Sequence, residues 1–183
     1  KEYMQAYHAC VSFIDAQLGL IDSLKKQGLW DDTIIIFTSD HGYHLGDHFI
    51  WGKVTLFDVG AKVPFIVRAP GLSKSGTASE AMVELIDVYP TLADLAELKA
   101  PNHLQGISLR PLLGHPDRLG KRKYAYSVVT RGPKNLGYAL RNQNWRYGKW
   151  PDGEELYNLR TDPQEKNNLA QKDHLKIRLE DFR

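Results

Sequence analysis

Apolar residues recur at helical spacing over the first part of the chain. Positions three and four apart form one stripe on a predicted helix: Tyr7, Val11, Ile14, Leu18, Ile21 and Leu24. Two lysines followed by Gly28 favour a helix end there, because cations interact well with the negative end of the helix dipole. A second helix is predicted over 88–98, with Asp87 as its N-terminal cap.

Two continuous apolar runs separate these helical segments. Residues 33–38 and 63–67 are rich in β-branched side chains, a composition typical of strands that are buried on both faces of a parallel sheet. Residues 82–86 are a candidate third strand. The alternation of such strands with helices predicts an α/β fold.

The pattern changes after about residue 115. Short alternating segments at 124–130, 137–141 and 144–149, joined by tight polar turns, predict an antiparallel meander that continues through a turn into 155–158. Residues 171–183 alternate charged and apolar positions and predict a helix that covers this small sheet. We therefore expect two domains, residues 1–115 and residues 116–183.

Composition limits the class of function. The 183 residues carry a formal charge of +2 and contain 42% hydrophobic residues, which is sufficient for a core and gives no indication of nucleic-acid binding or membrane insertion. The basic run at 121–123 is expected to be a solvated turn. The single cysteine, Cys10, excludes an internal disulfide framework.

The loop that follows the first apolar strand carries the candidate chemistry. It contains three histidines, two acids and a lysine within residues 40–53. Asp40 and His41 stand where an α/β strand ends, and a carboxylate beside an imidazole can bind one metal ion. Lys53 is a mobile point charge suited to a tetrahedral oxyanion such as sulfate or phosphate. We expect His44 to face the substrate.

The two metal-ligand candidates are too few for a complete site. Calcium takes about 6–8 oxygen ligands, so Asp40 and His41 would need further donors from elsewhere. Imidazole also suits manganese or zinc better than calcium, which leaves the identity of the ion open at this point.

Several strings of this sequence resemble the sulfatase family. They are Ser-Asp-His-Gly at 39–42, Leu-Gly-Asp-His at 45–48, Trp-Gly-Lys at 51–53, Phe-Asp at 57–58, Asp-Val-Tyr-Pro-Thr-Leu at 87–92 and Glu-Leu-Tyr-Asn-Leu-Arg-Thr-Asp-Pro at 155–163. The resemblance covers nearly the entire chain and is greatest to the iduronate-2-sulfatase branch.

This resemblance implies a function and a fold. The chain would be the C-terminal part of an alkaline-phosphatase-like parallel-sheet sandwich, followed by the small antiparallel sheet and its helix. Asp40 and His41 match the late pair of calcium ligands of the family, and Lys53 matches the lysine that binds the sulfate ester. Manganese or another divalent ion is an alternative. The formylglycine nucleophile is expected only in a missing N-terminal half, since Cys10 lacks the Cys-x-Pro-x-Arg context.

Three functions therefore remain open. The first is hydrolysis of a sulfate ester on a sulfated small molecule or glycan such as iduronate 2-sulfate. The second is hydrolysis of a phosphodiester or phosphonate monoester by the same superfamily. The third is a non-catalytic fragment that binds a partner. We expect association with the missing N-terminal half or self-association, and the family resemblance implies an exported, periplasmic or lysosomal location.

Overall fold

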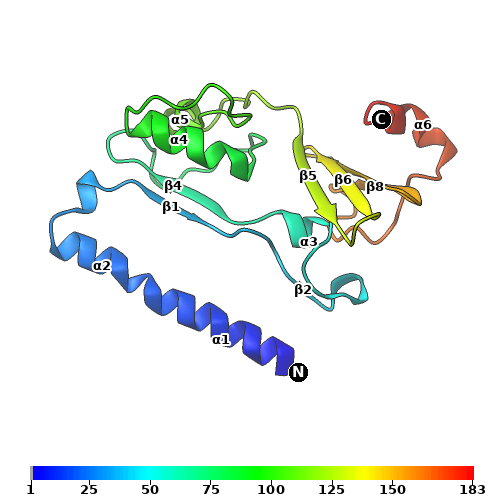
Figure 1. Ribbon diagram of the computed structural model, residues 1–183, viewed down its shortest axis with the longest axis horizontal. Coiled ribbons are helices and arrows are strands. Elements are labelled where there is room, and N and C mark those ends of the chain that lie inside the picture. The colour runs from blue at the N-terminus through cyan, green and yellow to red at the C-terminus, as the bar shows by residue number, and fades with distance from the viewer. Residues whose placement is uncertain (1) are drawn as a thin grey trace.

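The structure, a computed structural model, describes residues 2–183 and has an α/β architecture (Figure 1). The α-helices are α1 (Glu2–Gln17), α2 (Gly19–Lys26), α3 (Asp58–Ala61), α4 (Val88–Leu95), α5 (Arg110–Gly114) and α6 (Lys176–Glu180). The strands are β1 (Ile35–Thr38), β2 (His44–Leu45), β3 (Trp51–Gly52), β4 (Phe65–Arg68), β5 (Ala125–Thr130), β6 (Leu136–Arg141), β7 (Trp145–Trp150) and β8 (Gly153–Asn158). Short 3₁₀ turns lie at Trp30–Asp32, Asp47–Phe49, Leu85–Asp87 and Asp173–Leu175.

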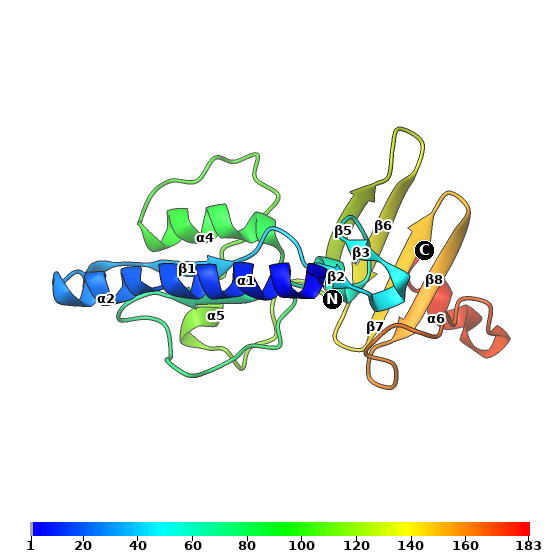
Figure 2. The ribbon, with the colours of Figure 1, turned by 90° about the horizontal axis from the view of Figure 1, so that it is seen from below.

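A two-stranded ribbon of β1 and β4 forms the centre of the first part of the molecule. The strands pair antiparallel, with Ile35 opposite Arg68 and Thr38 opposite Phe65. Figure 1 shows α1 and α2 on one side of this ribbon and α4 and α5 on the other, and in Figure 2 α1 and α2 run in front of β1. The ribbon therefore lies between helices.

This pairing corrects the expectation of parallel neighbours buried on both faces. The chain reverses within residues 39–64, which contain β2, β3 and α3, and returns alongside β1 in the opposite direction. Ile66 of β4 is 61% exposed. Of the candidate strand at 82–86, Met82 forms a single bridge with Arg122, and a 3₁₀ turn follows. An apolar run identifies a strand, but it does not specify the direction of its neighbour.

The long N-terminal helical stretch is present as α1 and α2, but its apolar stripe stays open to solvent. Neither helix buries a side chain within the part of the chain that the structure describes, and Ile14 is 50% exposed. The first turns of α1 contact the candidate loop, because the Tyr3 and Trp51 rings lie 5.8 Å apart and the Tyr7 and Tyr43 rings 6.0 Å apart. No helix among residues 2–183 is long and apolar enough to cross a membrane.

Asp87 precedes α4 as predicted, but its carboxylate makes no capping hydrogen bond to that helix. The side chain is fully buried and accepts hydrogen bonds from the backbone N–H groups of Glu84 at 2.9 Å and Ile107 at 2.8 Å. Arg122 forms an ion pair with the same carboxylate and with Glu84. The expectation of a solvated basic turn at 121–123 is therefore wrong for Arg122, which neutralises a buried acid.

The C-terminal sheet confirms the predicted meander with its covering helix. Strands β5 to β8 are antiparallel neighbours in chain order, and residues 153–158 form the fourth strand. Side chains from β7, β8 and the C-terminal segment make one hydrophobic core, consisting of Tyr147, Leu156, Leu179 and Phe182. Burial of this apolar surface attaches α6 to the sheet.

One carboxylate beside this core accepts hydrogen bonds from several side chains. Glu154 accepts hydrogen bonds from Arg183, Lys149 and the hydroxyl of Tyr147, with donor–acceptor distances of 2.6 to 3.1 Å. These hydrogen bonds, with that from Arg183 as the largest contribution, lower the pKa of Glu154 to about 2. The side chain is 13% exposed, so solvent screens the interactions only in part.

We predict that Glu154→Gln removes part of the pH dependence of stability. Because the pKa of Glu154 is lower in the folded chain than the roughly 4.3 of an unfolded chain, its stabilisation is complete above about pH 5 and is lost as pH falls toward 2. Urea unfolding should show the variant less stable than the parent at pH 6 and the difference shrinking by pH 2.5. The exposed Asp152→Asn in the adjoining turn is the control. Equal differences at both pH values would contradict the assignment.

Candidate functional site

The structure brings Asp40, His41 and Lys53 together just beyond the end of β1. The Asp40 Oδ2 atom lies 3.4 Å from His41 Nε2, and Lys53 Nζ lies 2.8 Å from the same nitrogen. Residues 12 positions apart meet because the β2–β3 hairpin folds the loop back, with His44 opposite Gly52. The three candidate residues therefore converge on one ring nitrogen.

Hydrogen bonding fixes the chemical state of the His41 ring. Nδ1 lies 2.8 Å from the carbonyl oxygen of Gly42, which can only accept, so Nδ1 carries the proton. Nε2 then keeps its lone pair and accepts the hydrogen bond from Lys53. A backbone carbonyl that orients an imidazole in this way is the usual support of a metal-binding histidine.

Two glycines allow the loop to pack against α3. The Gly42 N–H donates to the carbonyl of Gly60 at 2.9 Å. A Cβ at Gly42 would lie 2.0 Å from the Val59 oxygen, and a Cβ at Gly60 would lie 2.3 Å from Thr55 Oγ1. Contacts this short leave no room for a Cβ atom unless the neighbouring atoms shift, so α3 forms a close support behind Asp40 and His41.

The structure places His44 inside this support instead of toward a substrate. Its side chain is fully buried, with Nε2 2.7 Å from Thr55 Oγ1 and Nδ1 3.0 Å from the carbonyl oxygen of Asp47. Both ring nitrogens thus have partners in the chain. In this arrangement His44 joins the β2 strand to the segment that leads into α3.

The turn between β2 and β3 has unusual backbone conformations. Gly46 has a φ of 110°, and His48 and Phe49 have φ values of 54° and 60° although they carry side chains. Val54, which follows β3, has a φ of 70°. The His48 ring stacks on Phe57 with 3.8 Å between ring centroids, which holds the turn against the start of α3. Backbone strain of this kind persists only where surrounding contacts enforce it.

An open groove borders the convergent residues. It has a volume of about 1230 Å³ and is lined by Asp40, His41 and Lys53 together with residues of α3, β4 and β5. Asp40 and His41 side chains are 83% and 33% exposed, so a ligand in the groove can reach them. The site combines a carboxylate, a neutral imidazole and a cation at one edge of the groove.

The donors fit a metal ion only in part. Carboxylate oxygen and imidazole nitrogen lie close enough to bind one ion, and the histidine tautomer suits that role. Within residues 2–183, no group of three or more His, Cys, Asp or Glu side chains is arranged to hold a metal. Further ligands would have to come from outside this cluster, as the sequence predicts.

Sequence reasoning missed the residues that support the loop from behind. Thr55 is 2% exposed and binds His44, and Asp58 pairs with Arg141 across 83 positions. Glu165 is 2% exposed and accepts a hydrogen bond from the backbone N–H of Asp58. A polar residue at a buried position has no local periodic signal, so only the long-range contact identifies it.

The family model and the similar proteins all point to one family. The family model described as Sulfatase matches residues 1–98. A sulfatase of Formosa agariphila is 36% identical, with 98% of this chain and 35% of the relative covered. An N-acetylglucosamine-6-O-sulfatase of Bacteroides thetaiotaomicron is 33% identical (92% and 32% covered), and arylsulfatase K of Gallus gallus is 35% identical (90% and 33% covered). The chain spans about a third of the length of these relatives.

Solved structures agree with this result. A protein solved in complex with its substrate D-glucosamine-2-N,6-O-disulfate has a TM-score of 0.93 and 31% identity, with 100% of this chain and 39% of that chain covered. The phosphonate monoester hydrolase of Agrobacterium radiobacter has a TM-score of 0.86 and 31% identity, with 93% and 38% covered. The fold of this chain is therefore the alkaline-phosphatase-like fold of these enzymes.

We predict that Gly42→Ala loosens the loop. The new methyl group would meet the Val59 oxygen, so α3 and the Asp40–His41 segment must separate, at a cost of about 1–3 kcal/mol in the free energy of unfolding. Denaturant unfolding measures this change. Gly19→Ala is the matched control, because its Cβ would meet no atom within 4 Å. Equal stability of the two variants would show that the close contact is not maintained.

Proposed function

Because this chain belongs to the sulfatase family, we propose that it forms the C-terminal part of a metal-dependent enzyme that hydrolyses sulfate esters. The observation that carries the proposal is the convergence of Asp40, His41 and Lys53 at the open groove. The native protein that contains these residues would supply the rest of the site. Its formylglycine nucleophile would lie outside this chain.

The proposed substrate is a sulfated sugar. One relative, named as an N-acetylglucosamine-6-O-sulfatase, and the solved complex with a disulfated glucosamine support this class. Iduronate 2-sulfate, which the initial resemblance favoured, remains one candidate within it. The volume of the groove is sufficient for a sugar ring, and Lys53 in its lining can bind the anionic substituent.

Asp40 and His41 would hold the metal ion, with Ca²⁺ proposed and Mn²⁺ or another divalent ion as alternatives. Such an ion would neutralise negative charge on the sulfate oxygens. His41 Nε2 has one lone pair, so it cannot bind an ion and accept the Lys53 hydrogen bond together. We propose that Lys53 then leaves the ring and binds a sulfate oxygen instead.

A second candidate activity is hydrolysis of phosphonate monoesters or phosphodiesters. The similarity to the phosphonate monoester hydrolases of Agrobacterium radiobacter and Silicibacter pomeroyi, both at 31% identity, favours it. The groups proposed here can bind a tetrahedral anion whose central atom is either sulfur or phosphorus. A non-catalytic, partner-binding fragment is the third candidate.

The proposed partner is the remaining part of the enzyme or a second copy of this chain. The exposed apolar side chains of α1, including Val11 at 52% and Phe13 at 66%, support such an association. An exported, periplasmic or lysosomal location is proposed from the family.

We predict that Asp40→Asn in the native protein weakens metal binding and reduces kcat/KM by about 100-fold or more. Mutation of a residue that only hydrogen-bonds to a metal ligand already lowers metal affinity or activity by roughly 10–100-fold. Metal titration of hydrolytic activity measures both effects. Asp32→Asn, which changes an exposed acid outside the groove, should retain activity. A normal metal requirement in Asp40→Asn would refute the ligand assignment.

We predict that Lys53→Ala reduces kcat/KM while the thermal stabilisation by added metal persists, because this lysine binds substrate and not the ion. Lys62→Ala, which removes another lysine of the groove lining, is the control. The assay should compare an aryl sulfate, an aryl phosphonate monoester and sulfated monosaccharides including iduronate 2-sulfate. Preference for the phosphonate would establish the second candidate, and unchanged kinetics would remove Lys53 from the site.

A further inference from the structure

We propose that Glu165 is a positioning residue for the cluster of Asp40, His41 and Lys53. Its carboxylate fixes the start of α3, and α3 in turn holds the loop that carries the cluster. This role extends the proposed function. Only the activity measurement in the test below depends on that function. Glu165 touches none of the three residues, so it acts through the intervening backbone.

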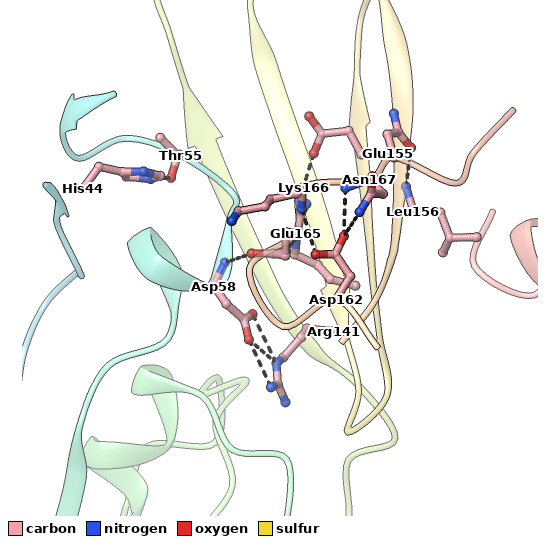
Figure 3. A network of polar contacts seen from close by, with 12 residues as sticks. His44, Thr55, Asp58, Arg141, Glu155, Leu156, Asp162, Glu165, Lys166 and Asn167 are labelled. Atoms are coloured by element: carbon pink, nitrogen blue, oxygen red, sulfur yellow. Dashed lines mark hydrogen bonds and ion pairs between the residues drawn. The ribbon is translucent and has the colours of Figure 1, made fainter. Parts of the chain in front are cut away.

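The first step is the contact between Glu165 and α3. Glu165 Oε2 accepts the backbone N–H of Asp58 at 2.6 Å, and Asp58 is the first residue of α3 (Figure 3). The N–H groups of a first helical turn have no partner within the helix. The buried carboxylate of Glu165 therefore supplies a hydrogen-bond acceptor for the first turn of α3, although Glu165 and Asp58 are 107 positions apart.

The second step leads from α3 to the cluster. The Gly60 carbonyl accepts the Gly42 N–H at 2.9 Å, directly after His41. Gly60 also packs on Thr55, which binds the buried His44 of β2. A shift of α3 therefore displaces both arms of the loop, the one with His41 and the hairpin that leads to Lys53.

The carboxylate itself is held rigidly. Arg146 is 1% exposed, and its Nε pairs with Glu165 Oε1. The Arg146 guanidinium lies over the rings of Phe57 and Tyr157, 4.9 and 4.8 Å from their centroids. Phe57 is the residue that precedes α3, so the same arginine contacts the carboxylate and the entrance to the helix.

A compact turn presents Glu165 to this pocket. The residue has a φ of 53°, and its own N–H donates to the Asp162 carbonyl at 3.0 Å. The Asp162 carboxylate accepts the backbone N–H groups of Lys166 at 3.1 Å and Asn167 at 2.7 Å. Figure 3 shows these bonds closing the turn beside β8. The turn thus has a local framework that is independent of α3.

Glu155 provides a matched comparison within the same network. Its Oε2 accepts a hydrogen bond from Arg146 Nη2 at 3.1 Å, and within the described residues its side chain forms no hydrogen bond with α3. A Glu→Gln change at 155 or at 165 removes one negative charge beside Arg146. At position 165 each carboxylate oxygen faces its own donor, Arg146 Nε at Oε1 and the Asp58 N–H at Oε2. Glu165→Gln replaces one of these oxygens with an NH2 group, which cannot accept a hydrogen bond.

The test compares Glu165→Gln with Glu155→Gln in the native protein. Hydrogen–deuterium exchange of peptides covering 40–46 and 57–62 reports the support directly. We expect about tenfold faster exchange of both segments in Glu165→Gln, as for a lost buried hydrogen bond, and unchanged exchange in Glu155→Gln. Glu165→Gln should also raise the metal concentration that gives half-maximal activity, with the substrate KM unchanged.

A milder variant keeps the test decisive if Glu165→Gln does not fold. Asp162→Asn weakens the turn that presents Glu165 without changing Glu165 itself, and it should accelerate exchange of the same two segments to a smaller extent. Equal exchange at 40–46 and 57–62 in the variants and the parent would overturn the proposal. If the variants show the predicted exchange but the parent has neither sulfatase nor phosphonate hydrolase activity, the positioning role of Glu165 stands and the proposed function is refuted.

Discussion

A buried carboxylate shared by two distant segments joins the parts of this molecule. Glu165 binds Arg146 of the C-terminal sheet through one oxygen and the start of α3 through the other. Two such donors offset the free energy that burial of a carboxylate costs, and burial raises the pKa of Glu165 above its usual value. The Asp58–Arg141 ion pair makes a second connection between the same segments, at 3.1 Å.

The candidate site depends on backbone packing more than on regular secondary structure. Asp40 and Lys53 lie on loop segments and are exposed, whereas the atoms behind them are among the most buried of the described chain. Close contacts at Gly42 and Gly60 leave α3 little freedom to move. An exposed set of polar groups on a rigid support is the arrangement that binding of a charged ligand requires, since ordering costs little further entropy.

Local pattern predicted the elements and the convergent residues. The apolar run of β1, the alternation in β5 to β7 and the density of histidines and acids around Asp40 are all properties of neighbouring residues. The antiparallel partner of β1 and the inward position of His44 were not predictable, because each depends on how the loop returns. Glu165 lies beyond local reasoning altogether, since its partner is set by the tertiary fold.

The long sequence separation between the two halves of this support has a consequence for synthesis in the cell. Asp58 leaves the ribosome 107 residues before Glu165 does, which at about 5–20 residues per second is a delay of roughly 5–20 s. Throughout that interval the segment with Asp40 and His41 exists without its final support. Packing of this segment against α3 in its final position is therefore a late event, coupled to completion of the C-terminal sheet.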